Sequence, residues 1–156
     1  MREERDSGSD TAAMINQYMV EGKIVPGEVT VGLMKKAIEK HAQGNKRKVL
    51  IDGFPRSQQN LDVWQKVMAE TATVPFVLFL DANEDAMIER IIERAKTSGR
   101  TDDNPESLKK RFAVFKGESL PIVEHFEAKG KVRKVDALGG IEEVYANVCS
   151  HFKGYI

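Results

Sequence analysis

The stretch that decides the fold reads Val74-Pro-Phe-Val-Leu-Phe-Leu-Asp81, a nearly continuous apolar run that ends in an aspartate. A second run of the same form is Lys48-Val-Leu-Ile-Asp52. Such runs are typical of strands that are buried on both faces of a parallel sheet. A weaker third candidate is Lys131-Val-Arg-Lys-Val-Asp136. We therefore predict a parallel sheet, with Asp52 and Asp81 at the carboxyl ends of two strands.

Helical spacing of apolar residues predicts helices around these runs. The apolar faces are formed by Met14, Ile15, Tyr18 and Met19, by Leu33, Met34, Ala37 and Ile38, by Met87, Ile88, Ile91 and Ile92, and by Val144, Tyr145, Val148 and Phe152. We expect Gly22 to end the first helix, and a long helical stretch from about Pro105 to Lys129 to bend near Pro121. The alternation predicts a three-layer α/β domain, a parallel sheet flanked by helices, with ligands at the carboxyl ends of the strands.

The composition excludes several classes of protein. The 156 residues carry 24 basic and 24 acidic side chains, so the overall charge does not favour nucleic acid or an acidic membrane surface. No apolar run approaches the roughly 20 residues of a membrane span. Cys149 is the only cysteine, which excludes an internal disulfide and a Cys-rich zinc site. We expect Cys149 in the core of a cytoplasmic protein.

The segment Ile51-Asp52-Gly53-Phe54-Pro55-Arg56 brings an acid, a flexible glycine, a rigid proline and an arginine to the end of an expected strand. Arginine binds phosphate with two parallel hydrogen bonds, glycine permits close backbone approach, and a strand-end aspartate can orient waters around Mg²⁺. The segment therefore predicts a phosphate site. In the alternative interpretation, Asp52 caps a turn and pairs with Arg56.

A second polar segment, residues 93–104, contains basic residues around a glycine. Arg90 and Arg94 are one helical turn apart, Arg100 follows in the loop, and Arg111 lies on the next helix. Four guanidinium groups could converge on a polyphosphate, and Asp102 and Asp103 could latch the loop. The alternative is a solvated surface of alternating charge.

Three motifs carry a family resemblance. They are Asp52-Gly-Phe-Pro-Arg56 followed by Gln58 and Asn60, the loop Ser98-Gly-Arg-Thr-Asp-Asp-Asn104, and Glu21-Gly-Lys-Ile-Val-Pro26. In this order and at these intervals they resemble the adenylate kinase superfamily, and within it the eukaryotic UMP/CMP kinases, over almost the entire chain. The resemblance implies a P-loop kinase-like fold and one nucleoside monophosphate kinase domain over residues 1–156. It places acceptor-binding helices at about 1–25 and a short lid at about 94–104.

The resemblance also implies a site for the acceptor monophosphate. Arg2, Arg100 and Arg111 are expected to contact its phosphate. The pocket lining is implied to be Lys23, Ile24, Val25, Gly53, Phe54, Pro55 and Arg56. Asn60 lies where adenylate kinases carry a glutamine facing adenine and UMP/CMP kinases an asparagine facing the pyrimidine. This position is the main ground for expecting CMP, UMP or dCMP as the acceptor.

On the donor side, Arg94 and Arg100 resemble the lid arginines that close over the ATP phosphates. Gly139 falls in the loop that packs on the donor base, where the family often has a lysine. Asp52 would contact Mg²⁺ through water. The implied reaction is in-line transfer of the γ-phosphoryl group of ATP to the monophosphate, with Arg94, Arg100 and Arg111 as catalytic residues and no protein nucleophile.

Enzymes of this family begin with a buried strand and a Gly-rich loop that binds the donor phosphates. Neither precedes Met1, and no G-x-x-x-x-G-K-S/T motif follows, so we expect an N-terminally truncated member. One alternative is an inactive homologue that binds monophosphate or serves as an interaction module. Another is a signalling domain that uses Asp52 or Asp81 as a phosphoacceptor, against which the arginine-rich lid argues. We expect nucleotide ligands, no nucleic acid or membrane partner, a monomer, and a role in pyrimidine biosynthesis in the cytoplasm or also the nucleus.

Overall fold

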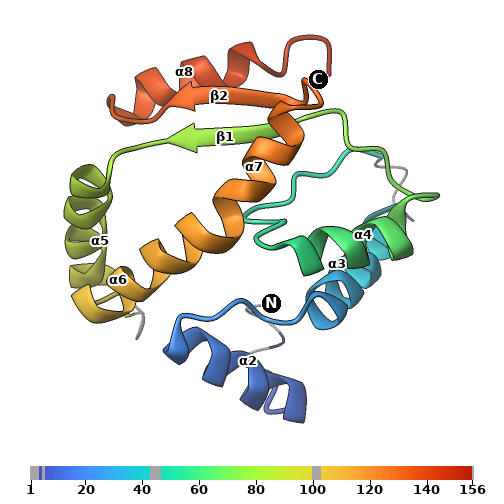
Figure 1. Ribbon diagram of the computed structural model, residues 1–156, viewed down its shortest axis with the longest axis horizontal. Coiled ribbons are helices and arrows are strands. Elements are labelled where there is room, and N and C mark those ends of the chain that lie inside the picture. The colour runs from blue at the N-terminus through green and yellow to red at the C-terminus, as the bar shows by residue number, and fades with distance from the viewer. Residues whose placement is uncertain (1–3, 5, 43–46, 100–102, 156) are drawn as a thin grey trace. The chain divides into compact units, whose positions relative to one another are not determined.

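The computed structural model of the chain describes residue 4 and residues 6–42, 47–99 and 103–155 (Figure 1). The chain divides into two compact units. The first comprises Met1–Thr73 and Glu106–Ile122, and the second comprises Val74–Pro105 and Val123–Ile156. In the described residues the first unit is helical, while the second contains the sheet.

The first unit is built around helices α2 (Asp10–Glu21), α3 (Gly27–Ala42) and α4 (Gln58–Met68). The Ser9 side chain caps the start of α2 by accepting from the Ala12 N–H, and Gly22 ends that helix with φ +69°. The predicted stop at Gly22 is therefore confirmed. The buried apolar side chains of this unit include Ile15, Val31, Leu61, Trp64 and Met68.

Helix α6 (Pro105–Val114) continues into a π-helical turn, η1 (Phe115–Ser119), and then into α7 (Leu120–Glu127). The predicted helical stretch is confirmed, and where a bend was expected near Pro121 the structure has this π-helical turn. In the π-helical turn the Leu120 N–H donates to the Phe115 carbonyl, five residues back. Proline has no N–H, and its ring would clash with the carbonyl four residues back, so the turn before Pro121 cannot be regular α-helix.

The second unit contains two parallel strands, β1 (Val77–Asp81) and β2 (Val132–Asp136), which pair from Val77 with Val132 to Asp81 with Asp136. Helix α5 (Glu84–Ser98) follows β1, and α8 (Ile141–Ser150) follows β2. Figure 1 shows α8 running alongside the two strands. The predicted strands at 74–81 and 131–136, and their parallel pairing, are therefore confirmed.

The predicted strand at residues 48–52 was wrong. Among the described residues the sheet consists of β1 and β2, and residues 48–52 do not pair with either. Leu50 is 83% exposed and Val49 is 43% exposed. A strand requires a hydrogen-bonded neighbour as well as an apolar sequence, so the pattern alone did not produce one here.

The expected core position of Cys149 was also wrong, because its side chain is exposed. Along α8 only Val144 and Val148 are partly buried, four residues apart on one face. Cys149 is one residue further along, which is about 100° around the helix. Tyr145, expected on the apolar face, is 64% exposed.

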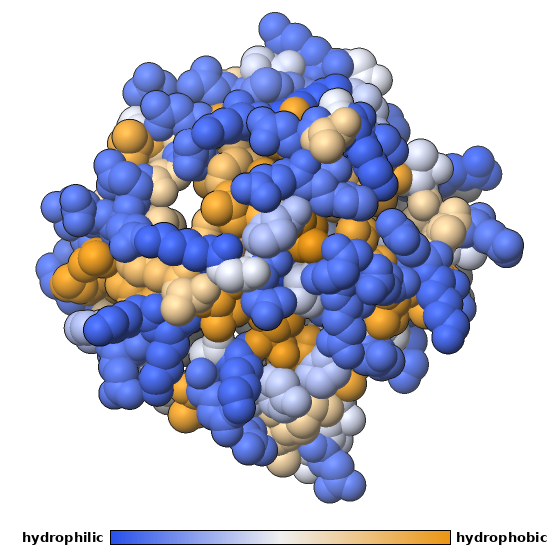
Figure 2. Space-filling view, in the orientation of Figure 1, coloured by the Kyte–Doolittle hydropathy of each residue, from blue (hydrophilic) through white to orange (hydrophobic). Residues whose placement is uncertain are grey.

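Hydrophobic residues are exposed among hydrophilic ones on the face of the molecule seen in Figure 2. The largest exposed fractions include those of Ile141, Leu50, Val20 and Tyr145. Among the described residues no helix combines the length and apolar character that crossing a membrane would require.

Candidate functional site

The loop that contains Gly53 is shaped around the Arg56 side chain. Gly53 has φ +66°, a conformation that side chains disfavour. A Cβ atom at Gly53 would lie 2.5 Å from Arg56 Nη2, so the guanidinium lies directly against this glycine. Arg56 Nε donates to the Gly53 carbonyl at 2.6 Å. The loop therefore holds the arginine in one orientation, as a phosphate-binding residue requires. The Phe54–Pro55 peptide bond within it is cis.

The start of helix α4 fixes the backbone of the same loop. Ser57 caps α4, its hydroxyl accepting from the Asn60 N–H at 3.2 Å. Asn60 in turn accepts the Arg56 backbone N–H on Oδ1, also at 3.2 Å. One helix terminus thereby connects the expected phosphate residue, Arg56, with the expected base residue, Asn60.

Asn60 is 2% exposed, and its Nδ2 atom is buried without a hydrogen-bond partner in the described structure. A buried amide that lacks a partner costs about 1–3 kcal/mol, so an acceptor that reached Nδ2 would recover this cost. The Phe54 and Trp64 rings pack beside this position with their centroids 5.5 Å apart. The predicted base-facing residue thus has a donor to offer.

The segment Lys23-Ile24-Val25 comes from the end of α2 and leads into α3. Lys23 pairs with Glu21 at 2.7 Å, and their hydrogen bond raises the pKa of Lys23 and lowers the pKa of Glu21. At the start of α3, a Cβ on Gly27 would lie 3.2 Å from the Gln59 carbonyl and 3.4 Å from Asn60 Cα. The start of α3, two residues after this predicted lining segment, therefore lies close to the first turn of α4.

Helix α6, which carries Arg111, passes beside the end of α2. A Cβ on Gly22 would lie 3.1 Å from Lys110 Cβ. Lys23, Ile24, Val25, residues 53–56, Asn60 and Arg111 thus all belong to the first unit. Arg2 and Arg100, the other predicted acceptor residues, lie outside the described residues.

Arg94 on α5 makes a two-pronged ion pair with Asp103. Arg94 Nε lies 2.9 Å from Asp103 Oδ2, and Nη2 lies 2.6 Å from Oδ1. The Ser98 hydroxyl donates to the same carboxylate at 2.8 Å. The Asp103 side chain is fully buried, while that of Arg94 is 42% exposed. This agrees with the suggestion that Asp103 latches the loop, and it sets the direction of the Arg94 guanidinium.

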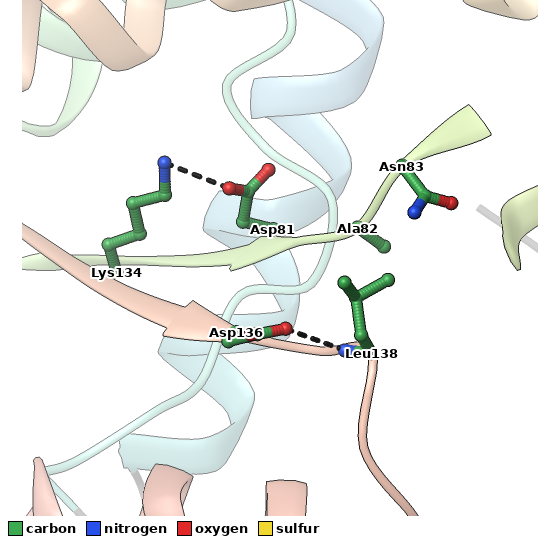
Figure 3. Close-up of a pocket in the computed structure, with 6 residues that line it drawn as sticks. All are labelled: Asp81, Ala82, Asn83, Lys134, Asp136 and Leu138. Atoms are coloured by element: carbon green, nitrogen blue, oxygen red, sulfur yellow. Dashed lines mark hydrogen bonds and ion pairs between the residues drawn. The ribbon is translucent and has the colours of Figure 1, made fainter.

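A pocket of about 570 Å³ opens at the carboxyl ends of β1 and β2. Its lining, drawn in Figure 3, is Asp81, Ala82, Asn83, Lys134, Asp136 and Leu138. Lys134 Nζ lies 2.8 Å from Asp81 Oδ2, which raises the pKa of Lys134. Asp136 Oδ1 accepts from the Leu138 N–H at 2.8 Å. The pocket lies where the sheet pattern predicted ligands.

The predicted donor-loop residue, Gly139, follows this pocket directly. A Cβ on Gly139 would lie 2.5 Å from Glu143 Oε2, the tip of a flexible side chain on α8. Arg90 Nη2 donates to the Leu138 carbonyl at 3.4 Å, which ties α5 to this loop. Sequence reasoning did not assign Lys134 to the site, although it lies within a predicted strand, two residues before the end.

Asp52, the expected Mg²⁺ residue, is exposed and immediately precedes the Gly53 loop. Within the described residues no three carboxylate, histidine or cysteine side chains are grouped to hold a metal directly. A single exposed carboxylate suits Mg²⁺, which retains several waters and binds proteins through one or two carboxylates.

Comparison with known proteins gives a consistent assignment. The family described as Adenylate kinase matches residues 1–131. The mouse and human proteins named UMP-CMP kinase are each 45% identical over 155 residues, covering 97% of this chain and 79% of theirs. The uridylate kinase of Saccharomyces cerevisiae is 44% identical over 94% of this chain and 70% of its own. The chain therefore belongs to the adenylate kinase family of nucleoside monophosphate kinases, and is of its UMP/CMP kinase type.

Proposed function

We propose that the acceptor of this nucleoside monophosphate kinase is a pyrimidine nucleotide, CMP, UMP or dCMP, and that ATP is the donor. The observation that carries the proposal is Asn60. Its Oδ1 is occupied by the Arg56 N–H, while its buried Nδ2 has no partner in the described structure. Cytosine offers O2 and N3 as acceptors and uracil offers O2 and O4. A base seated against Asn60 would satisfy this donor.

The acceptor phosphate would be bound by arginines of the same unit. Arg56 lies against Gly53 and four residues before Asn60, so one turn of backbone separates the proposed phosphate and base contacts. Arg111, together with Arg2 and Arg100, which lie outside the described residues, would complete the proposed phosphate set. Lys23, Ile24, Val25 and the residues from Gly53 to Pro55 would line the nucleotide.

On the donor side, Arg94 would stabilise the charge that spreads over the transferred phosphoryl group, because Asp103 already orients its guanidinium. The loop at Gly139, beside the strand-end pocket, would pack on the donor base. Bound Mg²⁺ would neutralise charge on the ATP phosphates, and Asp52 would hold it through water. The chain offers no nucleophile for this reaction, since the acceptor phosphate oxygen itself attacks. Positioning and charge stabilisation are the protein's contribution.

Separate calorimetric titrations with CMP, UMP, AMP and ATP test the proposal. We expect CMP and UMP to bind at least about tenfold more tightly than AMP. Adenine also has ring-nitrogen acceptors, but its two-ring base would have to shift to present one to Asn60 Nδ2, and one hydrogen bond to a buried group is worth on the order of 1–1.5 kcal/mol. Equal affinity for AMP would contradict the pyrimidine assignment.

A second candidate function is monophosphate binding without phosphoryl transfer. It is favoured by the gathering of the described acceptor residues in one compact unit, separate from Arg94 and Gly139. The same titrations separate the two functions. Binding of both CMP and ATP supports transfer, whereas binding of CMP with no binding of ATP supports the second candidate.

A further inference from the structure

The acceptor loop receives a contact from a residue 63 positions away in the sequence. The Ser119 hydroxyl donates a hydrogen bond to the Arg56 carbonyl at 2.8 Å. Both residues belong to the first unit. Arg56 is therefore held on both sides of its backbone, since its N–H donates to Asn60 Oδ1 and its carbonyl accepts from Ser119.

The helix that carries Ser119 is irregular at this point. Ser119 is the last residue of the π-helical turn η1, whose hydrogen bond runs from the Leu120 N–H to the Phe115 carbonyl. Because Pro121 forbids the regular bond to the Gly117 carbonyl, the chain makes a wider turn just before it. The extra residue turns the following positions by about 100° relative to a regular helix. Ser119 lies at the end of the wider turn, so its side chain points in a different direction from the one that a regular helix would give it.

We propose that Ser119 is a positioning residue for the acceptor nucleotide, and that the π-helical turn exists in this chain to aim its hydroxyl at Arg56. The inference rests on the proposed function, because it assigns Arg56 to the acceptor phosphate and Asn60 to the base. Ser119 itself would contact neither the phosphate nor the base. It acts by fixing the peptide that joins Arg56 to Ser57, the residue that caps α4.

The expected size of the effect follows from a single hydrogen bond to a carbonyl. Losing such a bond changes an equilibrium by about 5- to 10-fold when the ordered state is the one that binds. Helix propensity cannot account for a loss in Ser119→Ala, because alanine favours helix more than serine does. Ser119→Thr retains a hydroxyl on the same carbon.

The test compares the CMP affinity of the original chain by calorimetry with that of five variants, which are Ser119→Ala, Ser119→Thr, Ser150→Ala, Arg56→Ala and the double variant Arg56→Ala/Ser119→Ala. We expect Ser119→Ala to weaken binding about 5- to 10-fold and Ser119→Thr to stay within about twofold of the original chain. Ser150 is the matched control, because its hydroxyl also donates to a backbone carbonyl, that of Asn147 at 2.7 Å. Ser150→Ala should leave CMP affinity unchanged. In an Arg56→Ala background, Ser119→Ala should add less than about twofold, since its effect passes through Arg56.

Amide hydrogen exchange over residues 53–60 tests the effect of the Ser119–Arg56 hydrogen bond in the absence of nucleotide. Exchange should be faster in Ser119→Ala than in the original chain or in Ser150→Ala. If the original chain binds neither CMP nor UMP, the proposed function fails, while unchanged exchange in Ser119→Ala overturns the positioning role itself. Unchanged CMP affinity in Ser119→Ala, or an equal loss in Ser119→Thr and in the Arg56→Ala background, overturns it as well.

Discussion

Two arginines of the proposed site are oriented by different chemistry. Arg56 is set by contacts of its own loop, in which its Nε meets the neutral Gly53 carbonyl and its backbone is bonded to Asn60 and Ser119. Arg94 is set through its guanidinium alone, by the buried carboxylate of Asp103. In the first arrangement, contacts within and beside a loop hold both backbone and side chain. In the second, helix α5 holds the backbone and Asp103 fixes the end of the side chain.

This difference predicts which property a substitution at each arginine should change. A change at the Arg56 loop should alter ligand affinity, because the loop is built around the arginine and the proposed base contact together. A change at Arg94 should alter stability as well, because it leaves Asp103 buried with fewer donors. Acceptor binding and lid integrity should therefore respond to separate substitutions.

The largest effect is expected at Arg56. Arg56→Ala should lower CMP affinity about 100-fold, because hydrogen bonds to a charged group contribute roughly 1.5–3 kcal/mol. The CMP affinity of Arg56→Lys should lie between that of the original chain and that of Arg56→Ala, since lysine retains the charge without the paired donors. Calorimetry measures both. An Arg56→Ala chain that binds CMP as tightly as the original would remove Arg56 from the site.

The next effect concerns Arg94. Arg94→Ala should lower the free energy of unfolding by about 2 kcal/mol, because the fully buried Asp103 carboxylate loses two N–H donors. Lys96→Ala, two residues along the same helix, is the control. Lys96 pairs with Glu93 where both side chains are largely exposed, so its loss should cost less than about 0.5 kcal/mol. Urea denaturation measures the free energy of unfolding of both variants. Equal losses would show that the Arg94–Asp103 pair stabilises the fold no more than the exposed Lys96–Glu93 pair does.

A smaller and more selective effect is expected at Asn60. Asn60→Asp keeps an oxygen to accept the Arg56 N–H but replaces the Nδ2 donor with an acceptor. The ratio of CMP to AMP affinity should fall about tenfold. Because AMP carries the same phosphate, the ratio cancels repulsion between the new carboxylate and the phosphate. An unchanged ratio would argue that the base does not contact Asn60.

The smallest effect concerns pH. Lys23 lowers the pKa of Glu21 below its ordinary value of 4.5, so the pair's contribution to stability is present above that pH. It is lost as the pH falls through the lowered pKa. The melting temperature of Lys23→Met should therefore be lower than that of the original chain by about 1 °C or less at pH 7. At about pH 3 the two melting temperatures should be the same. Lys35→Met, at the looser 4.0 Å pair with Glu39, is the control and should show a smaller difference. A gap that persists at acid pH would contradict the pairing.

Local patterns predicted most helices and two strands. Gly22 and Pro121 mark chain irregularities by their own conformational limits, and the apolar run before Asp81 produced β1 as expected. The run before Asp52 has the same pattern without a pairing partner in the described residues. Apolar content therefore indicates where a strand can form, while the neighbouring strand decides whether it does.

The candidate site follows the same division between local patterns and contacts of distant residues. Gly53 and Arg56 lie three residues apart in one short segment, so the sequence alone marks them as candidates, and their roles in binding stay predictions. The contact of Ser119 with Arg56 bridges 63 positions and depends on a π-helical turn, and no local pattern reveals it. The Lys134 position at the strand-end pocket likewise depends on the pairing of β2 with β1.

A crystal structure of the chain with CMP tests the central claim most directly. We expect Asn60 Nδ2 within about 3 Å of cytosine O2 or N3, the ordinary hydrogen-bond distance, and the Arg56 guanidinium on the phosphate. A bound CMP whose base lies away from Asn60, leaving Nδ2 without a partner, would contradict the account.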